Sequence, residues 1–337
     1  MKLSIQSVLK YAFFLGIAAL LLYWVYGNQD FGKVLEDMKS ANPFWIGVSI
    51  IAALTSHLSR GWRWTIALQP AGYKLNPFRA FLAVMIGYFA NIFVPRMGEI
   101  ARCGILNKTD KIPVPISFGA VVAERALDLI VLITLTTITI FIEFNRIGDF
   151  LTERLELGYQ SLSKDTLLVL FAIGILGLIL LFIVYTQRHR LRNLPGYSKV
   201  TEFIIGLKEG LFSITQLGTS QKVAYVLHTV NIWIMYYVMT YVLFFTQEQT
   251  SDLSMLCGLS VFIMGGIGIV IPTPGGIGSY HLFVGATLIA YNLPEADSKA
   301  FAFLMHSTQT LALLATGGIS LLVTSFLKPK TDEGTMV

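Results

Sequence analysis

The stretch that decides the fold reads NIFVPRMGEIAR and spans residues 91–102. It ends an apolar run, breaks on Pro and Gly, and then spaces Arg96, Glu99 and Arg102 three residues apart. Side chains at this spacing share one face of a helix. The stretch is therefore either a cytoplasmic loop that follows a transmembrane helix, or a polar helix that begins inside the bilayer.

The composition is typical of an integral membrane protein. Of the 337 residues, 54% are hydrophobic and only 13% are charged, whereas a soluble domain is about 25% charged. The net charge of +5 favours basic cytoplasmic loops over nucleic-acid binding, because membrane proteins concentrate Lys and Arg there. Two cysteines, Cys103 and Cys257, exclude a disulfide framework and lack metal-ligand spacing.

About six apolar runs are long enough to cross a bilayer as helices, which takes roughly 20 residues. We interpret the first run as a spanning helix and not a cleaved signal peptide, because it is long and no A-x-A-like site follows it. The predicted spans are 8–27, 43–59, 114–142, 166–186, 222–245 and 299–327.

Two further apolar segments do not fit a simple span. Segment 80–94 is shorter than the roughly 20 residues required, and segment 254–292 is interrupted by PTPGGIG at 272–278. We therefore predict two re-entrant or broken helical hairpins, over about 80–111 and about 254–292. The predicted breaks are at Pro95 and Gly98 in the first hairpin and at Pro272, Pro274, Gly275 and Gly276 in the second.

The two breaks resemble each other in sequence. NIFVPRMGE and GIVIPTPGG each have apolar residues, then Pro, then two residues, then Gly. Paired interrupted segments in the two halves of a membrane protein indicate an inverted repeat with a site near the midplane. The predicted fold is thus an all-α polytopic integral membrane protein, with 1–337 as a single transmembrane domain built on such a repeat.

The distribution of basic residues predicts the orientation. With both termini in the cytoplasm, the inner segments hold most of the Lys and Arg residues, as the positive-inside rule requires. The first hairpin lies between basic segments, so we expect it to enter from the cytoplasm. The second lies between acidic segments, so we expect it to enter from outside a bacterial cytoplasmic membrane. These acidic residues are Glu248, Asp252, Glu295 and Asp297.

Charged residues also lie within a predicted span. Glu124, Arg125 and Asp128 follow Val114 in an apolar run, and the two carboxylates share a helix face. A charge at the bilayer centre costs roughly 2.5–3.5 kcal/mol, so these side chains must be paired or hydrated. We predict that they meet the three charged residues of the opening stretch. The predicted set is Arg96, Glu99, Arg102, Glu124, Arg125 and Asp128.

Two interpretations of this set stay open. It is either a neutral ion-pair network that holds the first hairpin to the next helix, or a hydrated cavity that binds an anionic group. A lipid phosphate suits the second interpretation, because the planar guanidinium fork bonds phosphate bidentately.

The other polar residues give weaker signals. RGWRW ends the second predicted span, and we expect Arg60 and Arg63 to be interfacial anchors, with headgroup contact as the alternative. His281 is a candidate to line the second hairpin and to contact a headgroup. No metal-ligand spacing, phosphate loop or nucleophile–base pair stands out. The sequence therefore predicts no metal site, no cofactor and no catalytic residue.

Four motifs together resemble a known family. RGWRW (60–64), NIFVPRMGEIAR (91–102), AERALD (123–128) and PTPGGIG (272–278) are similar to the flippase-like transmembrane domain of lysylphosphatidylglycerol synthases, which also occurs as free-standing bacterial and archaeal membrane proteins. The resemblance implies a polytopic helical domain with re-entrant helices, associated in the full synthases with moving aminoacylated lipid between leaflets. Those synthases carry a soluble domain that transfers the aminoacyl group. This chain ends soon after its last predicted span, so we expect no enzyme activity.

Two functions are compatible with these features. The first is a translocase for an anionic phospholipid or a lipid-linked precursor, with no nucleic-acid partner. The second is a non-transporting scaffold for an envelope glycosyltransferase or lipid-modifying enzyme. The first predicts a cavity at the charged residues, and the second predicts closely packed charges without a lipid-sized opening.

Overall fold

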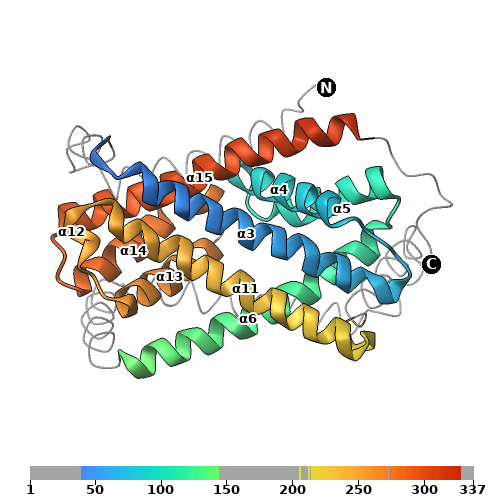
Figure 1. Cartoon of the computed structure of the whole chain (residues 1–337), viewed down its shortest axis with the longest axis horizontal. Coiled ribbons are helices and arrows are strands. Elements are labelled where there is room, and N and C mark those ends of the chain that lie inside the picture. Colours follow the sequence, from blue (N-terminus) through green and yellow to red (C-terminus); the bar gives the residue numbers. More distant parts are fainter. Residues whose placement is uncertain (1–38, 144–204, 206–211, 213, 272, 328–337) are drawn as a thin grey trace, which may run out of the picture. The chain divides into compact units, whose positions relative to one another are not determined.

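The computed structural model describes residues 39–143, 205, 212, 214–271 and 273–327, and every secondary-structure element in these ranges is a helix (Figure 1). The predicted spans 8–27 and 166–186 and the predicted break at Pro272 lie outside the described residues. The chain divides into two units, residues 1–136 with 207–337 and residues 137–206. The helices named below belong to the first unit, except that residues 137–142 at the end of one of them belong to the second.

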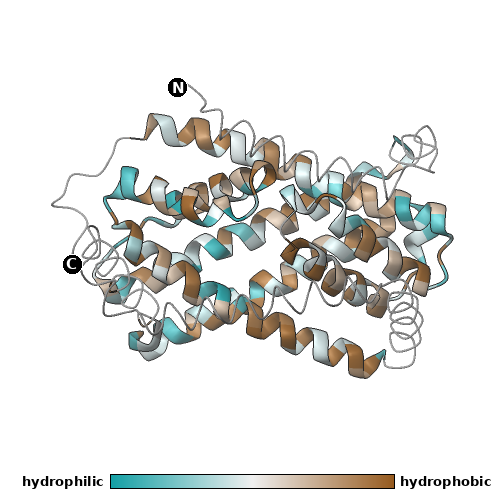
Figure 2. Ribbon diagram, turned by 180° about the vertical axis from the view of Figure 1, so that it is seen from behind, coloured by the Kyte–Doolittle hydropathy of each residue, from teal (hydrophilic) through white to brown (hydrophobic). Residues whose placement is uncertain are grey.

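Four long helices correspond to four of the predicted spans. They are α3 (Pro43–Leu68), α6 (Val114–Ile142), α11 (Thr219–Tyr241) and α15 (Glu295–Phe326). Within the described ranges, three helical segments are long and apolar enough to cross a membrane, namely Val114–Ile142, Thr219–Thr246 and Glu295–Phe326. Figure 2 shows hydrophobic residues along much of these helices. The protein is thus an all-α, multi-pass membrane protein, as predicted.

Helix α3 differs from its prediction at one end. The predicted span ends at residue 59, whereas the helix continues to Leu68. Short helices cap the long ones: η1 (Gln69–Ala71) follows α3, η2 (Ile214–Gln216) precedes α11, and η3 (Val242–Thr246) and α12 (Glu248–Ser251) follow α11.

Both predicted hairpins are confirmed as pairs of short helices. The first consists of α4 (Pro77–Phe93) and α5 (Met97–Asp110). The second consists of α13 (Met255–Val270) and α14 (Ser279–Ala290), with η4 (Pro274–Gly276) at its break. The side of the membrane from which each hairpin enters stays a prediction.

Glycine allows the two arms of the first hairpin to close. The Gly98 N–H donates to Asn91 Oδ1 at 2.6 Å. A Cβ atom at Gly98 would overlap the Gly87 carbonyl oxygen and the Asn91 side chain. In the second hairpin, a Cβ atom at Gly268 would lie 3.0 Å from the Ser279 carbonyl oxygen. Both hairpins therefore depend on a glycine where their arms approach.

The order helix, hairpin, helix occurs twice along the chain. In the first half it is α3, α4–α5 and α6, and in the second half it is α11, α13–α14 and α15. Helix α3 packs against α11 and α4, and α15 packs against α4 and α14. The tips of the hairpins also meet, because Arg96 Nη2 donates to the Val270 carbonyl oxygen at 2.9 Å. This arrangement supports the predicted internal repeat.

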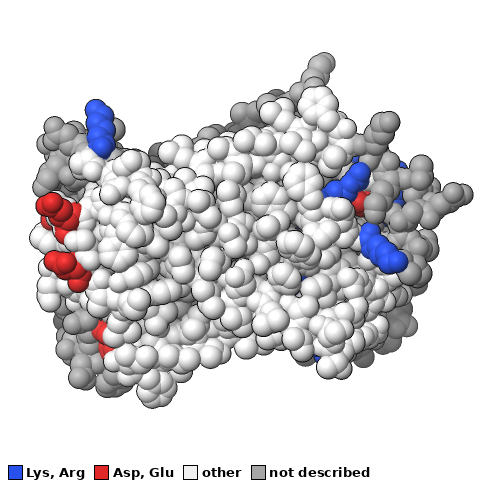
Figure 3. Space-filling model, in the orientation of Figure 1, with Lys and Arg blue, Asp and Glu red and all other residues white. Residues whose placement is uncertain are grey.

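Charged side chains are sparse on the face drawn in Figure 3. Asp and Glu gather on the side of α12, most Lys and Arg on this face lie near the C-terminal ends of α3 and α5, and the middle is uncharged. This is the distribution that a membrane protein needs, because the hydrocarbon region excludes unpaired charge.

We predict that Gly98→Ala destabilises the protein by about 1–3 kcal/mol, since the added methyl group must displace backbone. Gly104→Ala is the matched control on the same helix, because nothing lies within 4 Å of its added Cβ atom. We expect the control to be neutral or stabilising by up to about 1 kcal/mol. Thermal unfolding of the purified proteins in detergent measures both, and equal midpoints would contradict the close packing at Gly98.

Candidate functional site

A buried group of charged side chains joins α3, α5 and α6. We call it the arginine–carboxylate cluster. Its four cations are Arg60, Arg63, Arg102 and Arg125, and its three anions are Glu99, Glu124 and Asp128.

Glu124 lies at the centre of the cluster and is only 1% exposed. Its Oε1 accepts hydrogen bonds from Arg60 Nη1 and, at 2.9 Å, from Arg63 Nη2. Its Oε2 accepts from Arg102 Nη2 at 3.3 Å. One carboxylate thus holds three guanidinium groups from two other helices.

Asp128 repeats this arrangement one turn further along α6. Its Oδ2 accepts from Arg60 at 2.8 Å, and its Oδ1 accepts from Arg63 at 2.9 Å. Glu124 and Asp128 therefore do share a face of α6, as their spacing predicted. On α3, Arg60 and Arg63 are three residues apart, which also places them on one side of the helix, where each arginine bridges both carboxylates.

Helix α11 covers the cluster with polar and aromatic groups. Arg60 Nη2 donates to Tyr236 Oη at 3.2 Å, and Arg63 Nη1 donates to Thr229 Oγ1 at 3.1 Å. The guanidinium carbon of Arg63 also lies 5.6 Å from the ring centre of Tyr225. Sequence reasoning missed these three residues, because none of them is charged. Their only signal is a set of hydroxyl groups at near-helical spacing in an apolar helix.

The prediction that Arg60 and Arg63 are interfacial anchors was wrong. They are 2% and 0% exposed, respectively, and both pair with α6. The physical reason is the continuation of α3 to Leu68, which places RGWRW within the helix. Trp64 of the same motif is also buried, with the Arg102 guanidinium 4.7 Å from its ring centre. The signal for this pairing in the sequence was the presence of two arginines in one apolar helix and two carboxylates in another.

The prediction that Arg96 belongs to the charged set was also wrong. Arg96 is exposed, precedes α5, and has left-handed backbone geometry with φ of 63°. Its spacing from Glu99 therefore does not place it on the same helix face. Its side chain turns instead to the Val270 carbonyl oxygen at the end of α13.

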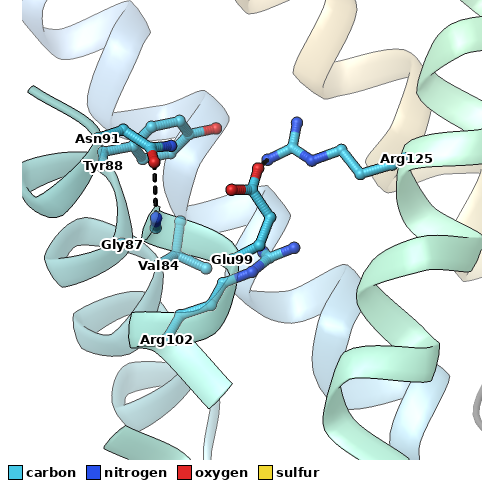
Figure 4. A pocket seen from close by; sticks show the side chains of 8 residues that line it. Val84, Gly87, Tyr88, Asn91, Glu99, Arg102 and Arg125 are labelled. Atoms are coloured by element: carbon cyan, nitrogen blue, oxygen red, sulfur yellow. Dashed lines mark hydrogen bonds and ion pairs between the residues drawn. The ribbon is translucent and has the colours of Figure 1, made fainter. Parts of the chain in front are cut away.

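The outer edge of the cluster is looser than its centre. Arg125 Nη2 lies 3.4 Å from Glu99 Oε1, and Arg125 Nη1 lies 3.8 Å from Asp128 Oδ2. The side chains of Arg125 and Glu99 are 38% and 15% exposed. Figure 4 shows Glu99 and Arg102 of α5 on one side and Arg125 of α6 reaching toward Glu99 from the other.

A small pocket opens at this edge. Its volume is about 10 Å³, which is room for about one water molecule. It is therefore too small for a lipid headgroup as it stands. The lining residues are Val84, Gly87, Tyr88, Asn91, Gly98, Glu99, Arg102 and Arg125.

The cluster carries one more positive than negative charge among the described residues. The Nε atoms of its four arginines and Oε2 of Glu99 are buried without a hydrogen-bond partner. Burying an uncompensated charge or an unsatisfied donor is costly. The arrangement can therefore accept an anion, with the guanidinium groups as donors.

His281 is in the first turn of α14, within the second hairpin, and is separate from the cluster; its contact with a headgroup stays a prediction. It is 2% exposed, and its Nδ1 accepts from the Gly278 N–H at 3.1 Å. In the described part of the chain, no group of three or more His, Cys, Asp or Glu residues is placed to hold a metal ion.

Comparison with known proteins gives a consistent result. A family model described as the lysylphosphatidylglycerol synthase TM region matches residues 8–317. A UPF0104 membrane protein of Methanocaldococcus jannaschii is 23% identical over 345 residues, which cover 96% of each chain. Another, from Methanothermobacter thermautotrophicus, is 23% identical over 275 residues, covering 74% of this chain and 76% of that protein.

The central role of Glu124 gives a testable prediction. Glu124→Gln keeps the shape of the side chain but leaves three guanidinium groups facing a neutral amide. We expect a loss of about 3–5 kcal/mol in stability, typical of a broken buried ion pair. Thermal unfolding in detergent measures it, with Asp128→Asn as a second variant that weakens the contacts to Arg60, Arg63 and Arg125 but leaves Glu124 in place.

The matched control is Glu295→Gln. Glu295 pairs with Lys299 at 2.7 Å, but its side chain is 65% exposed, so we expect a loss of only about 0–1 kcal/mol. If Glu124→Gln were no more harmful than this control, Glu124 would not be the centre of the cluster's stability.

Proposed function

Because this chain belongs to the lysylphosphatidylglycerol synthase TM-region family, we propose that it is a lipid translocase. Its cargo would be an anionic phospholipid or a lipid-linked precursor, held by its headgroup at the arginine–carboxylate cluster. The proposal places the protein in a bacterial cytoplasmic membrane with both termini in the cytoplasm. In this proposal the process needs no catalytic residue and no cofactor.

The observation that carries the proposal is the excess positive charge of the cluster. Four guanidinium groups face three carboxylates within apolar helices. Ionisable residues within transmembrane segments usually mark a pathway or a binding site. A phosphate group would balance the charge and accept several N–H donors at once. The planar guanidinium group of Arg suits this role, because it can donate two parallel hydrogen bonds to one phosphate.

The pair of Glu99 and Arg125 is where a headgroup would enter. It is the more exposed part of the cluster, and its 3.4 Å separation is long for an ion pair. In this scheme Glu99 occupies the place of the phosphate while no lipid is bound. A phosphate would replace the Glu99 carboxylate at Arg125, and α5 would move away from α6 to admit it.

A second candidate function has an observation in its favour. The pocket has a volume of only about 10 Å³, and the carboxylates of the cluster all have arginine partners. Closed packing of this kind suits a non-transporting scaffold for an envelope glycosyltransferase or lipid-modifying enzyme. The two proposals differ in whether the cluster ever opens.

Transport of a fluorescent phosphatidylglycerol in proteoliposomes tests the proposal. Loss of inner-leaflet fluorescence to external dithionite reports the transfer rate. We expect Arg125→Gln to slow transfer about tenfold or more, since a hydrogen bond to a charged group is worth about 1.5–3 kcal/mol. The control is Lys299→Gln, which removes a cation at the start of α15, outside the cluster.

The outcomes separate the candidates. Wild-type transfer no faster than in protein-free liposomes contradicts the translocase and leaves the scaffold. Active wild type with an unchanged Arg125→Gln rate removes the cluster as the headgroup site. Equal transfer of phosphatidylglycerol and phosphatidylcholine would contradict selection for an anionic headgroup.

A further inference from the structure

Two buried histidines bond directly to the broken backbone of the second hairpin. His281, in the first turn of α14, accepts a hydrogen bond at Nδ1 from the Gly278 N–H at 3.1 Å. His306, on α15, bonds through Nε2 to the Gly275 carbonyl oxygen at 2.9 Å. They are 2% and 7% exposed. The polar cluster described above uses neither residue.

The break needs such partners because its backbone leaves helical geometry. Gly275, Gly276 and Gly278 have φ values of 59°, 78° and 85°. The Gly276 N–H bonds to the Thr273 carbonyl oxygen and the Gly278 carbonyl oxygen accepts from the Leu282 N–H, whereas the Gly275 carbonyl oxygen and the Gly278 N–H bond to side chains. Freed backbone groups are costly to bury at membrane depth unless protein satisfies them. The two histidines provide this at one N–H and one C=O.

These bonds fix the position of the ring protons. A carbonyl oxygen only accepts, so Nε2 of His306 carries a hydrogen. A backbone N–H only donates, so Nδ1 of His281 presents its lone pair and the ring proton is on Nε2. The bond from Gly278 therefore requires His281 to be neutral.

The surroundings of the pair are aromatic. The centres of the two imidazole rings are 4.5 Å apart, and Phe303 stacks on His281 at 5.9 Å. The Tyr280 ring lies 5.2 Å from His306 and 6.2 Å from His281.

Other ionisable groups lie on the elements packed against the pair. On α15, Glu295, Asp297 and Lys299 are in its first turns, about two or more turns before His306. On α13 the one such group is Cys257, in the first turn of that helix. On the first hairpin, Arg96 at the tip is bonded to Val270, while Glu99 and Arg102 belong to the arginine–carboxylate cluster.

A proton on Nδ1 of His281 breaks the bond to Gly278. The ring would then present an N–H to a backbone N–H, at a helix N-terminus that already carries positive partial charge. The His306 ring, whose centre is 4.5 Å from that of His281, adds a second energetic cost to a positive charge on His281. Protonation of His306 on its other nitrogen, by contrast, leaves its donor to Gly275 in place. The two histidines therefore respond differently to a proton.

Loss of this bond affects the contact between the hairpins. A Cβ atom at Gly275 would lie 3.6 Å from the Ile92 Cα atom, so the second break rests on the tip of the first hairpin. Asn91, next to Ile92, lines the pocket beside Arg125. The second break is thus positioned to influence the arm that bounds this pocket.

We propose that His281 is a proton-binding site that acts, with His306, as a latch on the second hairpin. Neutral His281 holds the break closed against the first hairpin, and a proton taken up from water at its Nδ1 releases it. The inference goes beyond the proposed function, because it requires no particular cargo and no transport.

Hydrogen exchange of the full chain in lipid nanodiscs tests the latch. We compare peptides covering 273–290 at pH about 7.5 and about 5, after correction for the intrinsic effect of pH, with peptides of α5 as an internal reference. We expect exchange in 273–282 to become about tenfold faster at the lower pH. An unchanged rate in wild type would overturn the proposal.

Variants assign the effect to one residue. His281→Gln keeps a side-chain acceptor at a position where Gln commonly caps a helix, but it does not titrate, so the acid response should disappear. His228→Gln is the matched control on α11, where His228 bonds to Ser59, and it should keep the full response. An acid response that persists in His281→Gln would overturn the proposal.

His306→Gln keeps a donor for Gly275 and should also retain the response. If the response were lost in His306→Gln and kept in His281→Gln, the proton site would not be His281. Hydrogen exchange needs no lipid transfer, so failure of the transport assay and failure of the latch are separate results.

Discussion

The structure depends on a single requirement, that charges within apolar helices must be paired. Glu124 meets it by accepting from Arg60, Arg63 and Arg102. These contacts fix which face of α3 turns toward α6 and hold the first hairpin against both helices. They also account for the hydroxyl groups on the face of α11 that covers the cluster. Tyr236 and Thr229 accept hydrogen bonds from guanidinium N–H groups that do not bond to a carboxylate. Removing a partner from such a set costs more than the pair itself contributes.

Each half of the chain has the order helix, hairpin, helix, but the contact between the hairpin and the helix that follows it differs in chemistry. In the first half, the contact between hairpin and following helix is ionic, through Arg102 and Glu124. In the second half, the corresponding contact between α14 and α15 is made by the rings of His281 and His306. The first contact is charged under all ordinary conditions, whereas the second changes charge only when a histidine takes up a proton.

The local features of this fold were predictable from the sequence, and the long-range pairs were not. Both hairpin breaks contain Pro and Gly, which indicate an interrupted helix within an apolar segment. The four-residue spacing of Glu124 and Asp128 places them on a common helix face. The partners Arg60 and Arg63 lie more than fifty residues away, and the pattern of a single helix does not indicate which distant helix packs on it. The error for Arg96 has a local cause. Helix α5 begins one residue after Arg96, so the three-residue spacing from Arg96 to Glu99 does not place both side chains on one helix face.

The geometry of the cluster bears on whether it is only structural. Buried ion pairs seldom add net stability over apolar side chains of similar size, so stability alone does not account for seven charged groups with one excess positive charge. The contacts are also graded, from 2.8–2.9 Å around Asp128 and Arg63 to 3.4–3.8 Å at Arg125. The tight contacts involve the most buried side chains, and the loose ones border the pocket. A site that exchanges its own carboxylate for an external anion requires this combination of a rigid interior and a weakly held edge.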